Sequence, residues 1–300
     1  MRQAPPFFEG FEQLDFQAGG VRFRGVVGGQ GPPILLLHGF PQTHVAWRLV
    51  APQLAKSFTL IVPDLPGYGD SRTQSATPRW TKRRVADALA VLMGGLGHRR
   101  FGIVGHDRGA RAGYRLALDH PDRVTAFASL TVVPTLEALE AIDKDKAFAA
   151  FHWFMFAQPF DLPERLLACD PDAFFDTAMT KMSVDIDRFD RNAMQAYRMA
   201  FRDPAVRHAM CEDYRAAMNE DLAHDTADRA GGRQLACPVL VLWPDAKMSA
   251  LEPTPRQVWQ RWAGDVDGKA IAGGHLQPEE SADQVLTELL PFLARSRARA

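Results

Sequence analysis

The sequence lacks an excess of charge of either sign. Lysine and arginine together number 35, while aspartate and glutamate number 36, which gives a formal net charge of −1. Proteins that bind nucleic acids or acidic membrane surfaces need a basic excess on some face. We therefore expect neither nucleic acid nor a membrane as a partner, while a small local cluster of one sign stays compatible with this balance.

Cysteine and long apolar runs are also scarce. The three cysteines, Cys169, Cys211 and Cys237, are widely spaced and form no CxxC pair, so neither a disulfide framework nor a zinc site is indicated. The N-terminal stretch MRQAPPFFEGFE lacks the apolar core of a signal peptide. The most apolar later stretch, residues 147–157, is too short to span a bilayer. We expect a cytoplasmic protein that holds no metal.

Short apolar runs alternate with amphipathic stretches along most of the chain. At about 150 residues per domain, 300 residues correspond to one large domain or to two coupled layers. Unbroken apolar runs are typical of strands that are covered on both faces. They occupy residues 34–37, 59–62, 101–104, 126–133 and 239–243. Helical periods such as residues 81–93 separate them, which predicts an α/β fold with a mostly parallel sheet flanked by helices.

The middle of the chain has a different pattern. Residues 136–235 show helical periods and turns but no buried strand, and strand character resumes at 239. We expect residues 1–135 and 236–300 to form the sheet-containing core, and residues 136–235 to form a helical cap. Ligands of open α/β sheets bind outside the carboxyl ends of the strands, so a cap at that edge would cover the site.

The strongest chemical signal is a G-x-D-x-G turn between a predicted strand and a predicted helix. In residues 101–109 this turn presents Asp107 as in a nucleophile elbow, although an aspartate that caps the helix is an equal alternative. Phe40 follows another strand and can aim its backbone N–H at an oxyanion. A turn-rich loop, residues 64–71, and a late glycine-flanked His275 complete the pattern. Alone, His275 is better interpreted as an ordinary structural histidine.

A carboxylate nucleophile indicates displacement at a saturated carbon. A serine would leave an ether that water does not readily cleave, whereas Asp107 would leave an ester that a His275-activated water can hydrolyse. Arg108 and Arg111 lie three residues apart at the start of the next helix and can share a face. Arginine forks match carboxylates, so a carboxylate clamp is predicted beside the nucleophile; solvated helix arginines are the alternative.

Longer motifs run along almost the whole chain, and they include HGFPQTHVAW from His38, DLPGYGDS from Asp64, GHDRGAR from Gly105, FHWFMFAQP from Phe151, MCEDYRA from Met210 and GGHLQPEE from Gly273. With these motifs the sequence resembles the α/β-hydrolase superfamily and, within it, the fluoroacetate (haloacetate) dehalogenases. The resemblance implies an α/β-hydrolase fold with an inserted helical cap, catalysis without a cofactor, and a homodimer. It also implies that His152, Trp153 and Tyr214 donate hydrogen bonds to the departing halide. An aromatic helix face that packs the cap onto the sheet is the alternative for these three.

The resemblance fails at the acid that should orient the histidine. Members of the family carry an aspartate where this chain has Thr131, which cannot supply a negative charge. Asp245 follows the next predicted strand and is the substitute we consider, although the usual spacing would align Lys247 with the acid. The alternative is that Asp245 is simply a turn aspartate. If it does not serve, we expect hydrolysis of the Asp107 ester to limit turnover.

The expected activity is hydrolytic dehalogenation of a small 2-haloalkanoate such as fluoroacetate or chloroacetate. One alternative is an epoxide hydrolase, which uses the same steps and two cap phenols, for which Tyr197 and Tyr214 qualify. Another is a binding protein for small carboxylates that has lost turnover, an alternative that Thr131 supports.

Overall fold

The computed structural model describes residues 6–245 and 253–298. These residues form a nine-stranded sheet in the order β1-β2-β4-β3-β6-β7-β8-β9, with β5 paired to β2. The strands are β1 (Glu12–Ala18), β2 (Val21–Gly28), β3 (Pro33–Leu37), β4 (Thr59–Pro63), β5 (Arg72–Thr73), β6 (Phe101–His106), β7 (Val124–Leu130), β8 (Val239–Pro244) and β9 (Val266–Ile271). Pairing is antiparallel around β2 and parallel from β4 through β9. The predicted α/β class and mostly parallel sheet are confirmed.

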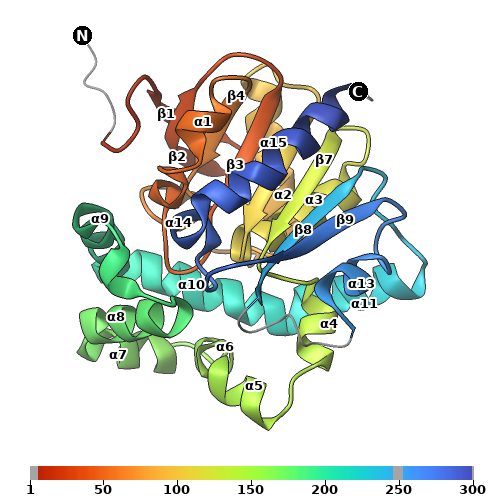
Figure 1. The fold of residues 1–300 in the computed structure, drawn as a ribbon. Coiled ribbons are helices and arrows are strands. Elements are labelled where there is room, and N and C mark those ends of the chain that lie inside the picture. Colours follow the sequence, from red (N-terminus) through yellow and green to blue (C-terminus); the bar gives the residue numbers. More distant parts are fainter. Residues whose placement is uncertain (1–5, 246–252, 299–300) are drawn as a thin grey trace.

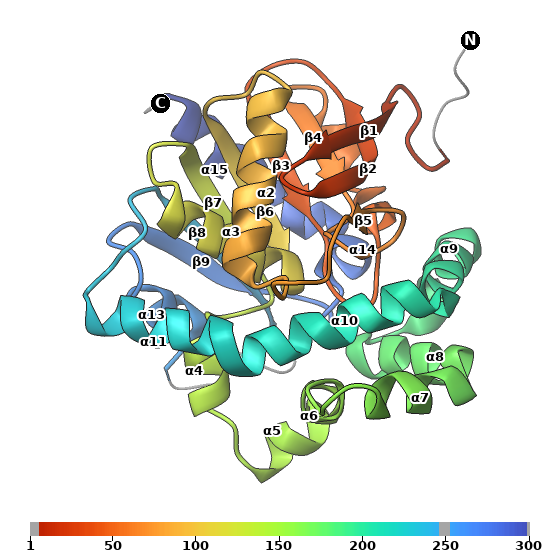
Figure 2. The same cartoon turned by 180° about the vertical axis from the view of Figure 1, so that it is seen from behind.

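Helices cover both faces of this sheet. Figure 1 shows α15 and α1 on one face, and the view from behind in Figure 2 shows α2 and α3 on the other. The helices outside the middle of the chain are α1 (Ala51–Leu54), α2 (Lys82–Gly95), α3 (Arg108–Asp119), α13 (Pro255–Trp259), α14 (Gln277–Glu280) and α15 (Ala282–Ala298), with a 3-10 turn, η1 (His44–Trp47). Strands β6 and β8 are buried along their whole length, as their unbroken apolar sequences predict.

A helical insertion lies between β7 and β8. It contains α4 (Thr135–Glu140), α5 (Lys144–Ala149), α6 (Phe151–Phe156), α7 (Leu162–Cys169), α8 (Pro171–Met182), η2 (Ile186–Arg188), α9 (Arg191–Arg202), α10 (Pro204–Ala216), η3 (Ala217–Asp221) and α11 (Leu222–Ala230). Figure 1 shows these helices gathered at the edge of the sheet where the strand arrows end. The division into a core of residues 1–135 and 236–300 and a cap of 136–235 stays a prediction.

The strand predicted over residues 126–133 ends earlier, at Leu130. Thr131 has a φ of +79°, in the left-handed region that a β-branched residue rarely adopts, so the chain leaves the sheet there. The prediction for residues 131–133 is therefore wrong, because an apolar run does not reveal a backbone reversal.

The parallel register brings the ends of four strands together. Leu37 lies opposite Gly105, His106 opposite Leu130, and Leu130 opposite Leu242. The segments that follow β3, β6, β7 and β8 therefore start at one edge of the sheet, beneath the insertion. In the described ranges, no helix combines the length and apolarity needed to cross a bilayer. A cytoplasmic location stays a prediction.

Candidate active site

Asp107 stands on a strained turn between β6 and α3. Its φ and ψ are 47° and −114°, and its side chain makes no capping hydrogen bond to the helix, so helix capping does not explain it. Such backbone conformations cost about 1–3 kcal/mol and are frequent at functional sites. The two flanking glycines are required by close contacts: a Cβ at Gly105 would lie 2.5 Å from Ala110 Cα, and one at Gly109 would lie 2.3 Å from the Leu37 carbonyl oxygen.

The two carboxylate oxygens of Asp107 have different partners. Oδ1 accepts a hydrogen bond of 2.9 Å from the backbone N–H of Phe40, while Oδ2 lies 3.5 Å from Nε2 of His275. Asp107 is 5% exposed. Burial alone would raise the pKa of this carboxyl, but the hydrogen bond and charge of His275 and the positive charge of Arg108 hold it well below its usual value. The carboxylate is therefore ionised and available as a nucleophile at neutral pH.

His275 is fixed through its backbone. Its N–H donates to the carbonyl of Met182, and its own carbonyl accepts from Nε2 of His106 at 2.8 Å and from the Thr131 hydroxyl at 3.0 Å. These bonds hold the loop so that the imidazole faces Asp107. Thr131 thus positions the histidine loop but brings no charge to the ring.

The structure does not bring Asp245 to His275. Asp245 is exposed directly after β8, and no hydrogen bond or ion pair joins it to His275 across the described ranges. Within those ranges, Asp107 is the carboxylate found within 4 Å of the His275 ring. Lys247 lies outside the described residues.

A cavity of about 470 Å³ opens in front of Asp107. Phe40, His152, Trp153, Tyr214 and His275 are among the residues that line it. The rings of His152 and Trp153 lie 5.7 and 6.4 Å from that of Tyr214, so the three aromatic side chains both pack together and face the cavity. Burial lowers the pKa of His152 to about 4 and raises that of Tyr214 well above its usual value. Both side chains are therefore neutral near pH 7, and each retains a hydrogen-bond donor.

Three buried arginines follow one another along α3, and two of them pair with acids of the insertion. Arg108 donates from Nε to the Asp213 carboxylate at 2.7 Å and from Nη2 to the Asp213 carbonyl at 2.9 Å. Arg115 pairs with Asp225 at 2.7 Å and also with Asp228. These ion pairs join α3 to α10 and α11.

Arg111, the arginine between them, is held by neutral groups instead. Its Nη1 donates to the Thr135 hydroxyl at 2.9 Å and to the Val133 carbonyl at 3.3 Å, and its Nε has no hydrogen-bond partner. Burial and the nearby charge of Arg108 lower the pKa of Arg111. In the part of the chain that the structure describes, no carboxylate lies within ion-pair distance of it. A buried charge without a partner is costly, so an anionic ligand would stabilise this side chain.

Arg111 lines a second cavity of about 430 Å³, together with Thr131. This cavity shares Trp153 and His275 with the one in front of Asp107, so the two adjoin. Arg108 is absent from the lining of both, because Asp213 and the ring of Tyr214, 4.4 Å from its guanidinium carbon, enclose it.

Sequence reasoning missed the groups that hold Arg108. Asp213 also accepts a hydrogen bond of 3.0 Å from the Tyr68 hydroxyl and pairs with Lys82. Burial alone would raise the pKa of Asp213, but Arg108 and Lys82 hold it well below the usual range. The available signals were the position of Asp213 immediately before Tyr214 and the place of Tyr68 in the DLPGYGDS motif, whereas nothing marked Lys82.

The second phenol expected for an epoxide hydrolase lies elsewhere. Tyr197 donates a hydrogen bond to Glu279 and does not line the cavity that contains Tyr214.

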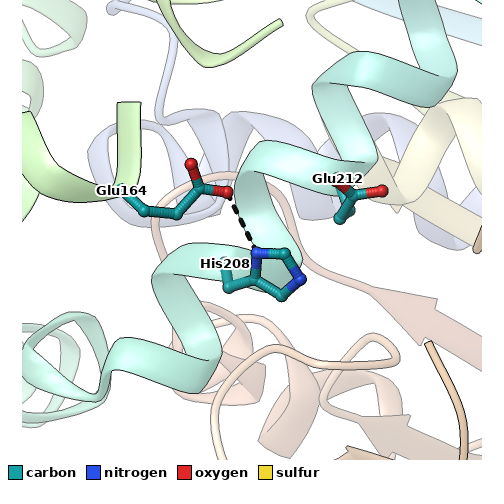
Figure 3. Close-up of side chains that lie close together, drawn as sticks. All are labelled: Glu164, His208 and Glu212. Carbon is teal, nitrogen blue, oxygen red and sulfur yellow. Dashed lines mark hydrogen bonds and ion pairs between the residues drawn. The ribbon is translucent and has the colours of Figure 1, made fainter. Parts of the chain in front are cut away.

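A cluster of Glu164, His208 and Glu212 has the composition of a metal site, with ligand atoms within 4.8 Å of one another (Figure 3). However, Nη1 of Arg215 lies 2.7 Å from Glu164 and 2.6 Å from Glu212, and Arg79 also pairs with Glu212. A metal ion would have to displace these guanidinium groups, so we interpret the cluster as an ion-pair network.

Comparisons with known proteins identify the family of the chain. The model of the alpha/beta hydrolase fold family matches residues 32–245. A fluoroacetate dehalogenase from a Burkholderia species is 38% identical over 295 residues, covering 97% of this chain and 96% of that protein. A soluble epoxide hydrolase from Corynebacterium sp. strain C12 is 29% identical, covering 93% and 96%.

A solved structure gives the same fold. This structure is the T131D mutant of a candidate epoxide hydrolase from Pseudomonas aeruginosa, with bound MFA. It superposes with a TM-score of 0.94 at 49% sequence identity, and the match covers 98% of this chain and 99% of that one. The chain therefore belongs to the α/β-hydrolase family, in the branch that contains fluoroacetate dehalogenase.

Proposed function

We propose that the protein is a hydrolytic dehalogenase that converts a small haloacetate, of the fluoroacetate or chloroacetate type, to the hydroxy acid. The observation that carries this proposal is the buried guanidinium of Arg111, which has no ion-pair partner among the described residues and lies one helical turn after the ionised, buried Asp107. This combination offers a place for a carboxylate next to a nucleophile that suits a saturated carbon. The family relationship to a fluoroacetate dehalogenase supports it.

In the first step Asp107 displaces the halide. The substrate carboxylate binds Arg111, while Arg108, oriented by Asp213, adds positive potential from behind Tyr214. Oδ2 of Asp107 is the attacking oxygen, because Oδ1 is already bonded to the Phe40 N–H. A bond forms between Oδ2 and the α-carbon as the carbon–halogen bond breaks, and the electron pair leaves with the halide. His152, Trp153 and Tyr214 donate hydrogen bonds to the departing anion in place of water.

In the second step water hydrolyses the ester. His275 takes a proton from a water molecule, which attacks the carboxyl carbon of Asp107. Oδ1, now the ester carbonyl oxygen, becomes the oxyanion, and the Phe40 N–H at 2.9 Å already donates to it. Collapse of this intermediate breaks the bond between the carboxyl carbon and Oδ2, the leaving alkoxide oxygen takes the proton from His275, and the hydroxy acid departs. The carboxyl group that remains on Asp107 loses its proton and is again a carboxylate. No cofactor is required by these steps.

Thr131 makes the second step the slower one. The acid of a catalytic triad stabilises the protonated histidine, and Thr131 offers His275 only a hydroxyl bonded to its backbone carbonyl. We expect the alkyl-enzyme ester on Asp107 to accumulate during turnover. The homodimer implied by the resemblance is part of the proposal as well.

Measuring halide release and hydroxy-acid formation from fluoroacetate and chloroacetate tests the function. Asp107→Asn, which keeps the shape of the side chain but removes the nucleophile, should abolish both. Epoxide opening without halide release would support the epoxide hydrolase alternative. The similarity to the Corynebacterium soluble epoxide hydrolase is the reason to test it. Carboxylate binding without either reaction would support the binding protein.

A further inference from the structure

The cavity in front of Asp107 is much larger than a haloacetate. Its volume of about 470 Å³ lies within the ~300–1,000 Å³ typical of pockets for drug-sized ligands. A haloacetate has about five non-hydrogen atoms, and at ~30 Å³ each, the volume per molecule of liquid water, it occupies roughly 150 Å³. About two thirds of the cavity is left over when a haloacetate is bound.

Five of the polar and aromatic residues that line this cavity form one cluster around Asp107. Asp107, His152, Trp153, Tyr214 and His275 form a connected cluster through ring contacts and the Asp107–His275 pair. The remaining lining is mostly apolar. Besides Phe40, it consists of Ala138, Ile142, Ala149, Ala150, Phe151, Phe174, Ala178 and Met182, with Lys146, Thr177 and Lys181. These residues come from helices of the insertion and the segments that join them, and Figure 1 shows α4, α5, α6 and α8 below the sheet.

Four of the apolar wall residues are alanines. A larger side chain at any of these positions would reduce the space, whereas alanine leaves it open beside the aromatic rings of Phe151 and Phe174. Burial of apolar surface against such a wall is favourable in proportion to the area removed from water. The wall therefore suits an apolar group on the ligand, while the cluster around Asp107 suits the reacting atoms and Arg111, in the adjoining cavity, suits the carboxylate.

The geometry points to 2-halocarboxylates with an apolar substituent on the α-carbon, an alkyl chain or an aromatic ring, as the preferred substrate class. This inference rests on the proposed dehalogenase function. With the carboxylate on Arg111 and the α-carbon at Oδ2 of Asp107, a substituent on that carbon occupies the volume that haloacetate leaves empty.

The reaction of such a substrate keeps the same balance of atoms and electrons. Oδ2 of Asp107 attacks the face of the α-carbon opposite the halogen, which leaves with the bonding electron pair. Water then attacks the carboxyl carbon of Asp107, so the bond from oxygen to the α-carbon is retained in the product. The product is a 2-hydroxy acid of inverted configuration at the α-carbon.

Competitive inhibition by simple carboxylates tests the inference without relying on the reactivity of the halide. Acetate, butanoate, hexanoate and phenylacetate are measured as inhibitors of chloroacetate turnover. The inhibition constant should fall about fourfold for each added methylene, as expected for a methylene that leaves water. An inhibition constant that stays level or rises from acetate to hexanoate would overturn the inference while leaving the dehalogenase function intact. Absence of halide release from every 2-halo acid would overturn the dehalogenase function and this inference with it.

A pair of variants on α8 locates the effect. Ala178→Phe adds a ring inside the cavity, and Ala173→Phe adds the same ring to an exposed position of the same helix. The ratio of the acetate to the hexanoate inhibition constant should fall at least tenfold in Ala178→Phe and stay within twofold in Ala173→Phe. Equal ratios in both variants and the unmodified protein would contradict the assignment of this wall. If Ala178→Phe does not fold, the inhibitor series on the unmodified protein still tests whether the cavity prefers carboxylates with an apolar substituent.

Discussion

Replacing Thr131 by aspartate should change which step limits turnover. Thr131 sits at a φ of +79°, which a β-branched residue rarely adopts but which aspartate tolerates better, so the replacement also relieves backbone strain. Thr131 and His275 line the same cavity, and the Thr131 hydroxyl donates to the backbone carbonyl of His275, so we expect a carboxylate at this position to lie near the His275 ring.

The size of the effect follows from the charge that is added. A carboxylate about 4 Å from the imidazolium interacts with it by about 4 kcal/mol at the effective dielectric constant of a partly buried site. If this energy acts fully on the transition state for ester hydrolysis, the step accelerates about 10³-fold. The loss of about 10⁴ in kcat on neutralising a triad aspartate in a serine protease sets an upper bound. Displacement of the halide should change little, because it does not use His275 as a base.

Intact-protein mass spectrometry distinguishes the two steps. After mixing with chloroacetate, the unmodified protein should carry the mass of one added carboxymethyl group, and the Thr131→Asp variant should carry far less at the same time point. Thr131→Asn is the matched control, because it has nearly the same shape but lacks the charge. A Thr131→Asn variant that clears the ester as fast as Thr131→Asp would refute the electrostatic argument, as would rapid turnover by the unmodified protein without any adduct.

Three further predictions concern charges around the site. Arg111→Met should raise KM for haloacetates at least 100-fold (about 3 kcal/mol for one charged hydrogen-bonded contact), measured by steady-state halide release; an unchanged KM would contradict the carboxylate site. Asp213→Asn should lower kcat/KM for chloroacetate more than for neutral chloroacetamide, because Arg108 loses the partner that orients it. Asp225→Asn is the control: it breaks the ion pair of Arg115 and should change kcat/KM equally for the two substrates. Asp64 should contribute about 2 kcal/mol to the fall in the free energy of unfolding between pH 5 and pH 2. Although burial opposes it, His44 lowers the pKa of Asp64 from 3.8 to about 2, so the stabilisation present above pH 4 is lost as Asp64 becomes protonated in the folded state. Urea unfolding at several pH values measures this loss, and an Asp64→Asn variant that keeps the full pH dependence would contradict it.

The fold was largely predictable because its strands are marked by local sequence. Buried parallel strands read as unbroken apolar runs, and β3, β4, β6 and β8 lie where such runs occur. The elbow at Asp107 is likewise local, since its flanking glycines are demanded by contacts within the turn and with β3. By contrast, the end of β7 at Leu130 depends on the backbone reversal at Thr131, which residue types alone do not reveal.

The electrostatic arrangement of the site was not predictable, because it depends on contacts between distant parts of the chain. Arg108 and Arg111 both lie at the start of α3, and only the fold shows that Asp213, about a hundred residues away, pairs with the first and not the second. The position of Asp245 away from His275 also required the structure, because its place after β8 is compatible with either arrangement. The residue types indicated which side chains form the site, but contacts between distant segments of the chain determine which of these side chains pair.

The covalent role of Asp107 is tested most directly by one turnover in oxygen-18 water. With enzyme in excess over chloroacetate, Asp107 should supply its own oxygen to the glycolate product, while water replaces that oxygen in the carboxylate. We therefore predict unlabelled product and, after proteolysis, a peptide containing Asp107 that is heavier by one oxygen-18. Labelled glycolate together with an unlabelled Asp107 peptide would show direct attack by water and would contradict the proposed mechanism.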